Sequence, residues 1–222
     1  MNCLLCHLPL NLPWGICSQC LKLSAISLSV CTVCGLPIAP KNKLCSHCIT
    51  FKPNWQVLTA FSDYSWPFKH LIYQLKSNNR TAISYALARL IFLSWYQIRQ
   101  SSGLVKPDIV TCVPLYKKRY WSRGYNQSAL LAKPIAYWLG ADFQPYLIKR
   151  NVSRTEQKLL SKSQRAMNVS DIFSCDEDLT GKTIAVVDDV VTTGHTVNEV
   201  SKKLKQQGSL HIQILCLCRT RL

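Results

Sequence analysis

The sequence predicts an α/β protein in which a small cysteine-rich module precedes a larger domain with a parallel sheet. Two observations support this prediction. Eight of the twelve cysteines lie within the first 48 residues, whereas apolar runs alternate with amphipathic stretches in the rest of the chain. Strands that alternate with helices favour a parallel sheet with right-handed crossovers. The composition changes near Trp55, so we expect the module at residues 1–52 and the larger domain at residues 53–222.

The N-terminal cysteines form four Cys-x-x-Cys pairs that repeat with a period of 14 residues. Each pair presents two sulfurs from one tight turn, so two pairs complete a tetrahedral zinc site. The simplest assignment is a double zinc ribbon, with one site formed by Cys3, Cys6, Cys17 and Cys20 and the other by Cys31, Cys34, Cys45 and Cys48. An interleaved pairing is also compatible with the spacing. A disulfide framework is a further alternative, but we expect no secretory signal in "MNCLLCHLPLNL".

The elements of the larger domain follow from the spacing of apolar residues. We expect strands at residues 56–64, 108–114, 182–189 and 211–218, with a short or edge strand at 143–148. Helices are expected at residues 80–99, 125–139 and 196–207. Pro134 must kink or restart the second helix, and Gly208 ends the third. The polar segment between Arg150 and Asp171 is long for a connection, which suggests a mobile loop.

The stretch "IAVVDDVVTTGHT", residues 184–196, places two adjacent carboxylates after a buried apolar run. We expect Asp188 and Asp189 to emerge where the strand leaves the sheet, followed by a turn into a helix. The N–H groups of such a turn attract a phosphate, and carboxylates accept hydrogen bonds from sugar hydroxyls. The stretch therefore predicts a ribose 5-phosphate site, with the phosphate held by Thr192, Thr193, Gly194, His195 and Thr196.

A purely structural role is the alternative for this stretch. Thr196 and Glu199 fit a capping box, and the two acids are acceptable turn residues. However, a helix cap requires neither two acids nor three threonines around one glycine, so the sequence favours a ligand site.

The same stretch resembles the phosphoribosyl-pyrophosphate (PRPP) signature of type I phosphoribosyltransferases. Three further segments, "CVPLYKKRYWSRGYNQSALLA" (112–132), "RTEQKLLSKSQRAMNV" (154–169) and "FSDYSWPFKHLIYQLK" (61–76), resemble the ComF-type competence proteins. That family joins double zinc ribbons to a phosphoribosyltransferase-like domain. The resemblance covers nearly the whole chain. It implies a cytoplasmic bacterial protein that acts on incoming single-stranded DNA in natural transformation, together with other proteins of the competence machinery.

The resemblance also assigns roles to individual residues. Asp188 and Asp189 match the acids that contact the ribose, as catalytic residues, and residues 192–196 match the 5-phosphate loop. His195 is a departure, because the family usually has a small residue there; its side chain either donates to the phosphate or points outward. The turn after Pro114 resembles the loop that contacts pyrophosphate. PRPP is expected with Mg²⁺, and its diphosphate is expected to contact Lys117, Lys118, Arg119 and Arg123.

Each of these additional contacts has a structural alternative. The three basic residues at 117–119 also fit a surface charge run, and "RGYNQ" (123–127) also fits a helix cap. Tyr120, Trp121 and Tyr125 interleave with the cations, as in sites where bases stack on aromatic rings, but core packing explains Trp121 equally well. The polar loop either closes over a bound ligand or is a solvated segment. The candidate contacts in this loop are Arg154, Thr155, Gln157, Arg165 and Asn168.

The formal net charge of +16 fits a polyanionic partner, nucleic acid first, and fits a solvated basic surface of no specific use equally well. No apolar run reaches the roughly 18 residues that span a bilayer, so we expect no membrane insertion. Three functions remain open: DNA handling with a PRPP-binding pocket, an active phosphoribosyltransferase that releases pyrophosphate to an unidentified acceptor, and a fold in which the ribbons only brace the larger domain. We favour the first, and the sequence leaves catalytic turnover undecided.

Overall fold

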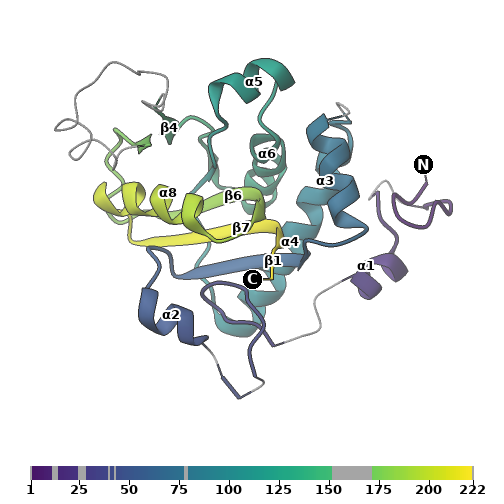
Figure 1. Ribbon diagram of the computed structural model, residues 1–222, viewed down its shortest axis with the longest axis horizontal. Helices are drawn as coiled ribbons and strands as arrows, with labels where there is room; N and C mark the ends of the chain where they lie inside the picture. The colour runs from purple at the N-terminus through teal and green to yellow at the C-terminus, as the bar shows by residue number, and fades with distance from the viewer. Residues whose placement is uncertain are drawn as a thin grey trace, which may run out of the picture.

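The computed structural model of the chain describes residues 2–11, 15–24, 29–39, 41–42, 44–77, 80–151 and 172–221. A parallel sheet lies at its centre (Figure 1). In spatial order its strands are β1 (Val57–Asp63), β7 (His211–Arg219), β6 (Thr183–Val191), β2 (Ile109–Cys112) and β3 (Asp142–Phe143). All neighbouring strands pair in parallel, so the predicted α/β fold is confirmed.

Helices cover both faces of the sheet (Figure 1). The larger domain contains α3 (Phe68–Ser77), α4 (Ile83–Ser102), α5 (Lys117–Arg123), α6 (Gln127–Leu139) and α8 (His195–Gln206). Side chains alternate between the two faces of a strand, and β6 shows this clearly. Ala185 and Val187 pack into one core with α3, α4 and α6, whereas Ile184 and Val186 pack into a second core with α8. Beside the main sheet, β4 (Lys149–Arg150) pairs antiparallel with β5 (Phe173–Ser174).

Strand β6 continues further than the sequence predicts. The two acids do not emerge where the strand leaves the sheet, because β6 runs through Asp188 and Asp189 to Val191. Its ladder with β7 includes the pair Asp188 and Cys216, and later Val191 and Arg219. The acids therefore lie within the carboxyl-terminal part of a central strand.

Two predicted helix features also differ from the structure. Helix α6 continues through Pro134 as one helix, so it does not restart there. Helix α8 begins at His195, and the residue before it is Gly194, which has no side chain that could cap the helix. The hydrogen bond at this turn runs instead from the His195 N–H to Thr193 Oγ1 at 3.4 Å. The capping box of Thr196 and Glu199 is therefore not the structure that starts α8.

The cysteine-rich segment consists of two copies of one small module. Each begins with an isolated β-bridge, Asn2 with Pro9 in the first and Val30 with Pro37 in the second. Each then ends in a short helix, α1 (Ser18–Ser24) or α2 (Ser46–Phe51). The two copies lie on different sides of the larger domain, α1 beside α3 and α4, and α2 below β1 (Figure 1).

Within the ranges described above, the structure contains no helix with both the length and the apolar character that a bilayer crossing requires.

Candidate functional site

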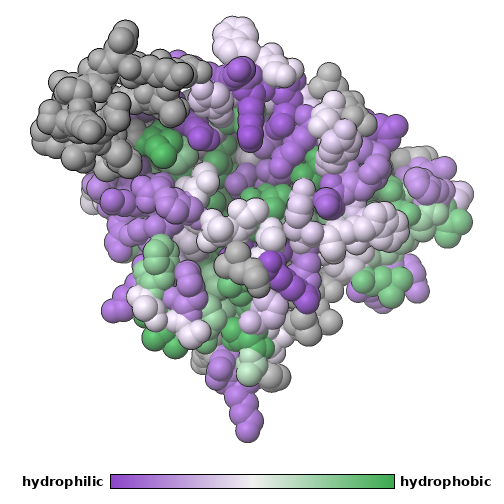
Figure 2. Space-filling view, in the orientation of Figure 1, coloured by the Kyte–Doolittle hydropathy of each residue, from purple (hydrophilic) through white to green (hydrophobic). Residues whose placement is uncertain are grey.

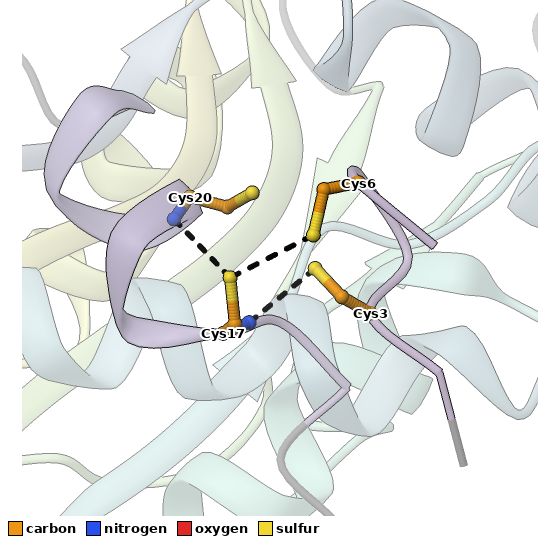
Figure 3. Close-up of side chains that lie close together, drawn as sticks. All are labelled: Cys3, Cys6, Cys17 and Cys20. Carbon is orange, nitrogen blue, oxygen red and sulfur yellow. Dashed lines mark hydrogen bonds between the residues drawn. The ribbon is translucent and has the colours of Figure 1, made fainter. Parts of the chain in front are cut away.

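Both four-cysteine groups have the geometry of a tetrahedral metal site. The structure brings together the two sets of the simplest assignment, with all ligand sulfurs of a set within 4.8 Å of one another. In the first set the four sulfurs converge on one point (Figure 3). Sγ atoms of Cys6 and Cys17 are 3.9 Å apart, and those of Cys34 and Cys45 are 3.5 Å apart. A tetrahedron with Zn–S bonds of about 2.3 Å has edges of about 3.8 Å, so both sets fit zinc.

Backbone N–H groups point at the sulfurs in the same way in both modules. The Cys17 N–H donates to Cys3 Sγ and the Cys45 N–H donates to Cys31 Sγ, each at 3.4 Å. Burial opposes ionisation of Cys3, but donors from Cys6, Cys17 and Leu5 outweigh it and lower the pKa of Cys3 to about 6. The same balance lowers the pKa of Cys31 to about 7. Burial and the neighbouring sulfurs instead raise the pKa of Cys34 to about 11, that of Cys20 to about 12, and that of Cys48. Because thiolate is the form that binds zinc, it is the charge of a bound cation that makes all four ligands of a set ionise.

The loop after β6 has the form of a phosphate cradle. Gly194 is buried and has a φ of +84°, a conformation that a residue with a side chain adopts at a cost. The side chains of Thr192, Thr193, His195 and Thr196 are exposed around it. A cavity of about 40 Å³ lies between this loop, the start of α8 and Asp188. The positive end of the twelve-residue helix α8 opens onto this cavity, which favours an anion there.

Asp188 lies at the edge of the cavity and is held by two hydrogen bonds. Its Oδ1 accepts from Ser128 Oγ at 2.8 Å and from the Asp189 N–H at 2.9 Å. Burial and the neighbouring Asp189 carboxylate raise the pKa of Asp188 to about 8, although the two hydrogen-bond donors act in the opposite direction. The protonated form therefore predominates at pH 7, and a cation at the site favours the ionised form.

Asp189 has a different environment, because Lys76 and Gln127 already contact its carboxylate. It is 3% exposed and forms an ion pair with Lys76, the penultimate residue of α3. Its Oδ1 also accepts from Gln127 Nε2 at 3.3 Å. Gln127 in turn accepts a hydrogen bond from Arg123 through its Oε1. Asp188 thus faces the cavity of the loop, whereas Asp189 belongs to a network that leads toward α5.

That network ends at a basic hollow of about 730 Å³ between α3 and α5. Hydrophilic side chains gather over these two helices above the sheet (Figure 2). The lining residues are Lys76, Ser77, Tyr116, Lys118, Arg119, Ser122 and Arg123. The hollow thus brings together three of the four residues expected at the diphosphate, while Lys117 is exposed at the start of α5 and is not among the lining residues.

Lys76 is a residue of this network that the sequence did not predict. It lies in the segment 61–76, which resembles ComF-type proteins. Lysine is common in the last turn of a helix, where its charge interacts favourably with the helix dipole. A lysine at this position therefore does not by itself indicate a binding site. Only the fold brings α3 to the carboxyl end of β6.

Most of the "RGYNQ" cluster joins α5 to α6. Gly124 ends α5 with a φ of +81°, and Asn126 starts α6, with its Oδ1 accepting from the Ser128 N–H at 3.0 Å. Asn126 Nδ2 donates to the Val113 carbonyl at 3.0 Å, and the Tyr125 hydroxyl donates to the Leu75 carbonyl. The helix-cap alternative therefore holds for Asn126 and Gly124, whereas Arg123 and Gln127 reach the network of Asp189.

The aromatic side chains on α5 point into solvent. Trp121 is 83% exposed and Tyr120 is 42% exposed, so core packing does not explain Trp121. Arg150 from β4 lies over the Tyr116 ring, 5.6 Å from its centre, and burial together with Arg119 lowers the pKa of Arg150. The candidates in the polar loop, Arg154, Thr155, Gln157, Arg165 and Asn168, lie outside the described residues.

Comparison with known proteins identifies similar sequences over nearly the whole chain. The phosphoribosyl transferase domain family matches residues 126–221. The DNA utilization protein YhgH of Salmonella typhimurium is 42% identical, over 98% of this chain and 96% of that protein. Competence protein F of Haemophilus influenzae is 34% identical, over 92% of this chain and 90% of that protein. Among solved structures, a purine phosphoribosyltransferase from Pyrococcus horikoshii has a TM-score of 0.37 and 22% identity, over 59% of this chain and 70% of that one.

Proposed function

The chain belongs to the family of DNA utilization protein YhgH and competence protein F, and on this premise we propose that it handles incoming single-stranded DNA and binds PRPP with Mg²⁺. The proposal has two parts, a ribose-phosphate site at the carboxyl end of β6 and a nucleic-acid surface on α5. The first part rests on the phosphate loop, and the second on the exposed aromatic and basic side chains beside it.

The phosphate loop is the observation that carries the proposal. Three exposed threonines surround a buried glycine at the positive end of α8, next to a half-buried carboxylate. N–H groups and hydroxyls bind the 5-phosphate of a ribose, and Asp188 accepts a hydrogen bond from a ribose hydroxyl. A carboxylate oxygen is also a ligand that Mg²⁺ prefers, and such an ion would supply the charge that keeps Asp188 ionised.

The basic hollow supports a diphosphate on the other side of the sugar. Lys118, Arg119 and Arg123 line it, and Arg123 is joined through Gln127 to Asp189. Guanidinium groups bind phosphate oxygens through paired hydrogen bonds. Because Asp189 is already held by Lys76 and Gln127, we assign it to positioning of this network, and we assign the direct sugar contact to Asp188.

A thermal-shift experiment tests the ribose-phosphate site. PRPP with Mg²⁺ raises the melting temperature of the wild-type protein, since a ligand that binds only the folded state stabilises it. Asp188→Ala removes most of that shift. Glu177→Gln, a change to an exposed acid outside the site, keeps it. A wild-type protein that shows no shift at millimolar PRPP contradicts this part of the proposal.

The DNA surface is tested by the loss of one aromatic ring. Stacking on an aromatic side chain contributes about 1–3 kcal/mol per base, so Trp121→Ala weakens binding of single-stranded DNA by roughly fivefold or more. Trp66→Ala is the matched control, because Trp66 is 79% exposed and lies before α3. Affinity should also fall steeply with salt concentration. Equal losses in the two variants, or binding that is indifferent to salt, would show that DNA binds elsewhere or is not bound.

Catalytic turnover is the second candidate function. The raised pKa of Asp188, about 8, favours it, since a group that titrates near neutral pH suits proton transfer. A screen of bases and amines for pyrophosphate release from PRPP decides between an enzyme and a binding protein. Release that depends on one acceptor and disappears in Asp188→Asn supports the enzyme.

A further inference from the structure

The second four-cysteine site lies directly against the phosphate loop. Trp55, which is 6% exposed, bridges the two. Its Nε1–H donates to the carbonyl of Val33 at 2.5 Å, and Val33 lies between the ligands Cys31 and Cys34. The far edge of the same ring lies under Gly194, because a Cβ built on this glycine would be only 3.3 Å from Trp55 Cη2. The Trp55 side chain thus contacts both the Cys31–Cys34 turn of the second metal site and Gly194 at the centre of the phosphate loop.

Arg219 makes a second connection between the same two regions. Arg219 is 3% exposed and lies at the end of β7. Nε donates to the Cys34 carbonyl at 2.8 Å, and Nη1 donates to the Val191 carbonyl at 3.1 Å. Val191 is the last residue of β6, immediately before the loop. Nη1 also donates to the Thr220 carbonyl at 3.1 Å, whereas the Cys34 carbonyl is the acceptor of Nε. A buried N–H group that loses its acceptor is costly, so the Cys34 carbonyl stabilises the position of Arg219.

A third connection holds the start of α8. Asn198 lies in its first turn, where its N–H donates to the Gly194 carbonyl at 2.9 Å. The Asn198 side-chain Oδ1 accepts from the Asn54 N–H at 3.0 Å and from Asn54 Nδ2 at 3.2 Å. Asn54 directly precedes Trp55. The backbone that positions the Trp55 ring is therefore also bonded to the helix that forms one wall of the phosphate cavity.

The first four-cysteine site has different neighbours. Cys3 and Ile16 pack into the core formed with α3 and α4, and a Cβ on Gly15 would be 2.5 Å from the Ala86 Cβ on α4. Figure 1 shows α1 on the side of α3 and α4, away from α8. The chain therefore contains two similar metal sites, of which the second contacts the phosphate loop through Trp55 and Arg219.

We propose that Trp55 and Arg219 are positioning residues that couple the metal-bound form of the second four-cysteine site to the shape of the phosphate loop. This inference rests on the proposed function, since it concerns affinity for the phosphate end of PRPP. A small turn that is held together by metal-bound cysteines keeps its fold only when the metal is bound. Without metal the carbonyls of Val33 and Cys34 lose their fixed positions, and the Trp55 indole and the Arg219 guanidinium lose acceptors. The loop then has to become ordered during binding, which lowers the apparent affinity.

Two cysteine variants at equivalent positions of the repeat test the coupling. Cys45→Ser removes a ligand of the second site, and Cys17→Ser removes the corresponding ligand of the first. Zinc content is measured for each, and the Kd for PRPP with Mg²⁺ is measured by calorimetry. We expect Cys45→Ser to weaken PRPP binding by about fivefold or more, within the usual range of coupling between two sites. Cys17→Ser should stay within about twofold of wild type. Equal losses, or no loss in Cys45→Ser, overturn the proposal.

Hydrogen exchange of the unliganded protein gives a readout that needs no ligand. Cys45→Ser should speed amide exchange at residues 192–198, and Cys17→Ser should leave those amides unchanged. If wild type does not bind PRPP, the proposed ribose-phosphate site fails, while exchange still decides whether the second metal site orders the loop. Unchanged exchange in Cys45→Ser means that the coupling does not exist.

A variant that keeps both metals separates the positioning role from metal loss. Trp55→Phe removes the Nε1–H donor and the ring edge that reaches Gly194. With a zinc content equal to that of wild type, it should reproduce the weaker PRPP binding of Cys45→Ser. Arg219→Lys, which keeps the charge, should bind PRPP more tightly than Arg219→Met. Full affinity in Trp55→Phe and Arg219→Met together would overturn the proposal, even if Cys45→Ser were too unstable to measure.

Discussion

At the scale of single residues, the two adjacent acids of β6 have separate environments. Asp188 faces the cavity of the phosphate loop, and burial raises its pKa to about 8. Asp189 is almost fully enclosed and forms an ion pair with Lys76. A buried carboxylate without a partner is strongly destabilising, so Lys76 permits an acid at this position. One of the two adjacent acids thus lines the cavity, and the other is bonded to side chains of α3 and α6.

The ion pair leads to a prediction about stability. Lys76→Met leaves the Asp189 carboxylate buried with Gln127 as its remaining described partner. We expect the free energy of unfolding at pH 7 to fall by about 1–3 kcal/mol, as for other buried groups that lose a partner. Urea unfolding measures the change. In a double-mutant cycle, Lys76→Met combined with Asp189→Asn should be more stable than Lys76→Met alone, since the unpaired charge is gone. A double variant that is less stable would refute this explanation.

The raised pKa of Asp188 predicts a pH dependence of stability with a definite sign. An unfolded aspartate ionises near pH 4, whereas Asp188 in the folded protein ionises near pH 8. Between these values the folded state binds more protons than the unfolded state. Asp188 therefore lowers stability progressively as the pH rises from about 4 to about 8. The fall in the free energy of unfolding between pH 5 and pH 8 should be smaller in Asp188→Asn. Equal pH profiles for the two proteins would contradict the raised pKa.

At the scale of elements, periodicity predicted the strands and helices that bury a continuous apolar face. The strands β1, β2, β6 and β7 and the helices α4, α6 and α8 were all expected, with boundaries that differ by a few residues. The prediction ended β6 at Asp189, because a pair of acids is unusual inside a buried strand. Their partners Lys76, Gln127 and Ser128 come from α3 and α6, which are distant in sequence.

Two helices of the larger domain, α3 and α5, were missed for different physical reasons. Helix α5, with the sequence KKRYWSR, has no buried residue, so no apolar pattern could have indicated it. Helix α3 does carry such a pattern, since its buried residues Phe68, Leu71, Ile72 and Leu75 have helical spacing. For the candidate site, the sequence singled out the loop and three of the basic residues that line the hollow, but it could not show that Trp55 lies against Gly194 or that Arg219 is bonded to the end of β6.

The phosphate loop gives a prediction at this scale. Gly194→Ala forces a side chain into a left-handed backbone conformation, which costs about 1–2 kcal/mol, and it also places a Cβ 3.3 Å from Trp55. Gly103→Ala is the matched control, because Gly103 has a φ of +66° and no atom within 4 Å of the added Cβ. We expect Gly194→Ala to lose more unfolding free energy than Gly103→Ala and also to lose affinity for PRPP. If both variants bind PRPP like wild type, the loop is not the phosphate site.

At the scale of the whole molecule, the cysteine modules are built into the larger domain. Cys3 and Ile16 belong to the core that includes α4, and the second module bonds to β1 through the Leu58 N–H and the Thr32 carbonyl at 3.1 Å. Val33 packs both with the cysteines of its own module and with the core under α8. The modules therefore contribute to the cores on both faces of the sheet.

This integration predicts how the protein responds to metal removal. A strong chelator should lower the midpoint of one common thermal transition, because loss of metal exposes Cys3, Ile16 and Val33 together with the cores against which they pack. Each 1 kcal/mol of lost stability lowers the midpoint by about 2–4 °C in a chain of this size, so a loss of several kcal/mol is readily measured. Calorimetry with and without chelator, with zinc content determined in parallel, provides the measurement, and the same chelator saturated with zinc is the control. A separate low-temperature transition, with the main transition unchanged, would instead mean that the modules fold independently of the sheet.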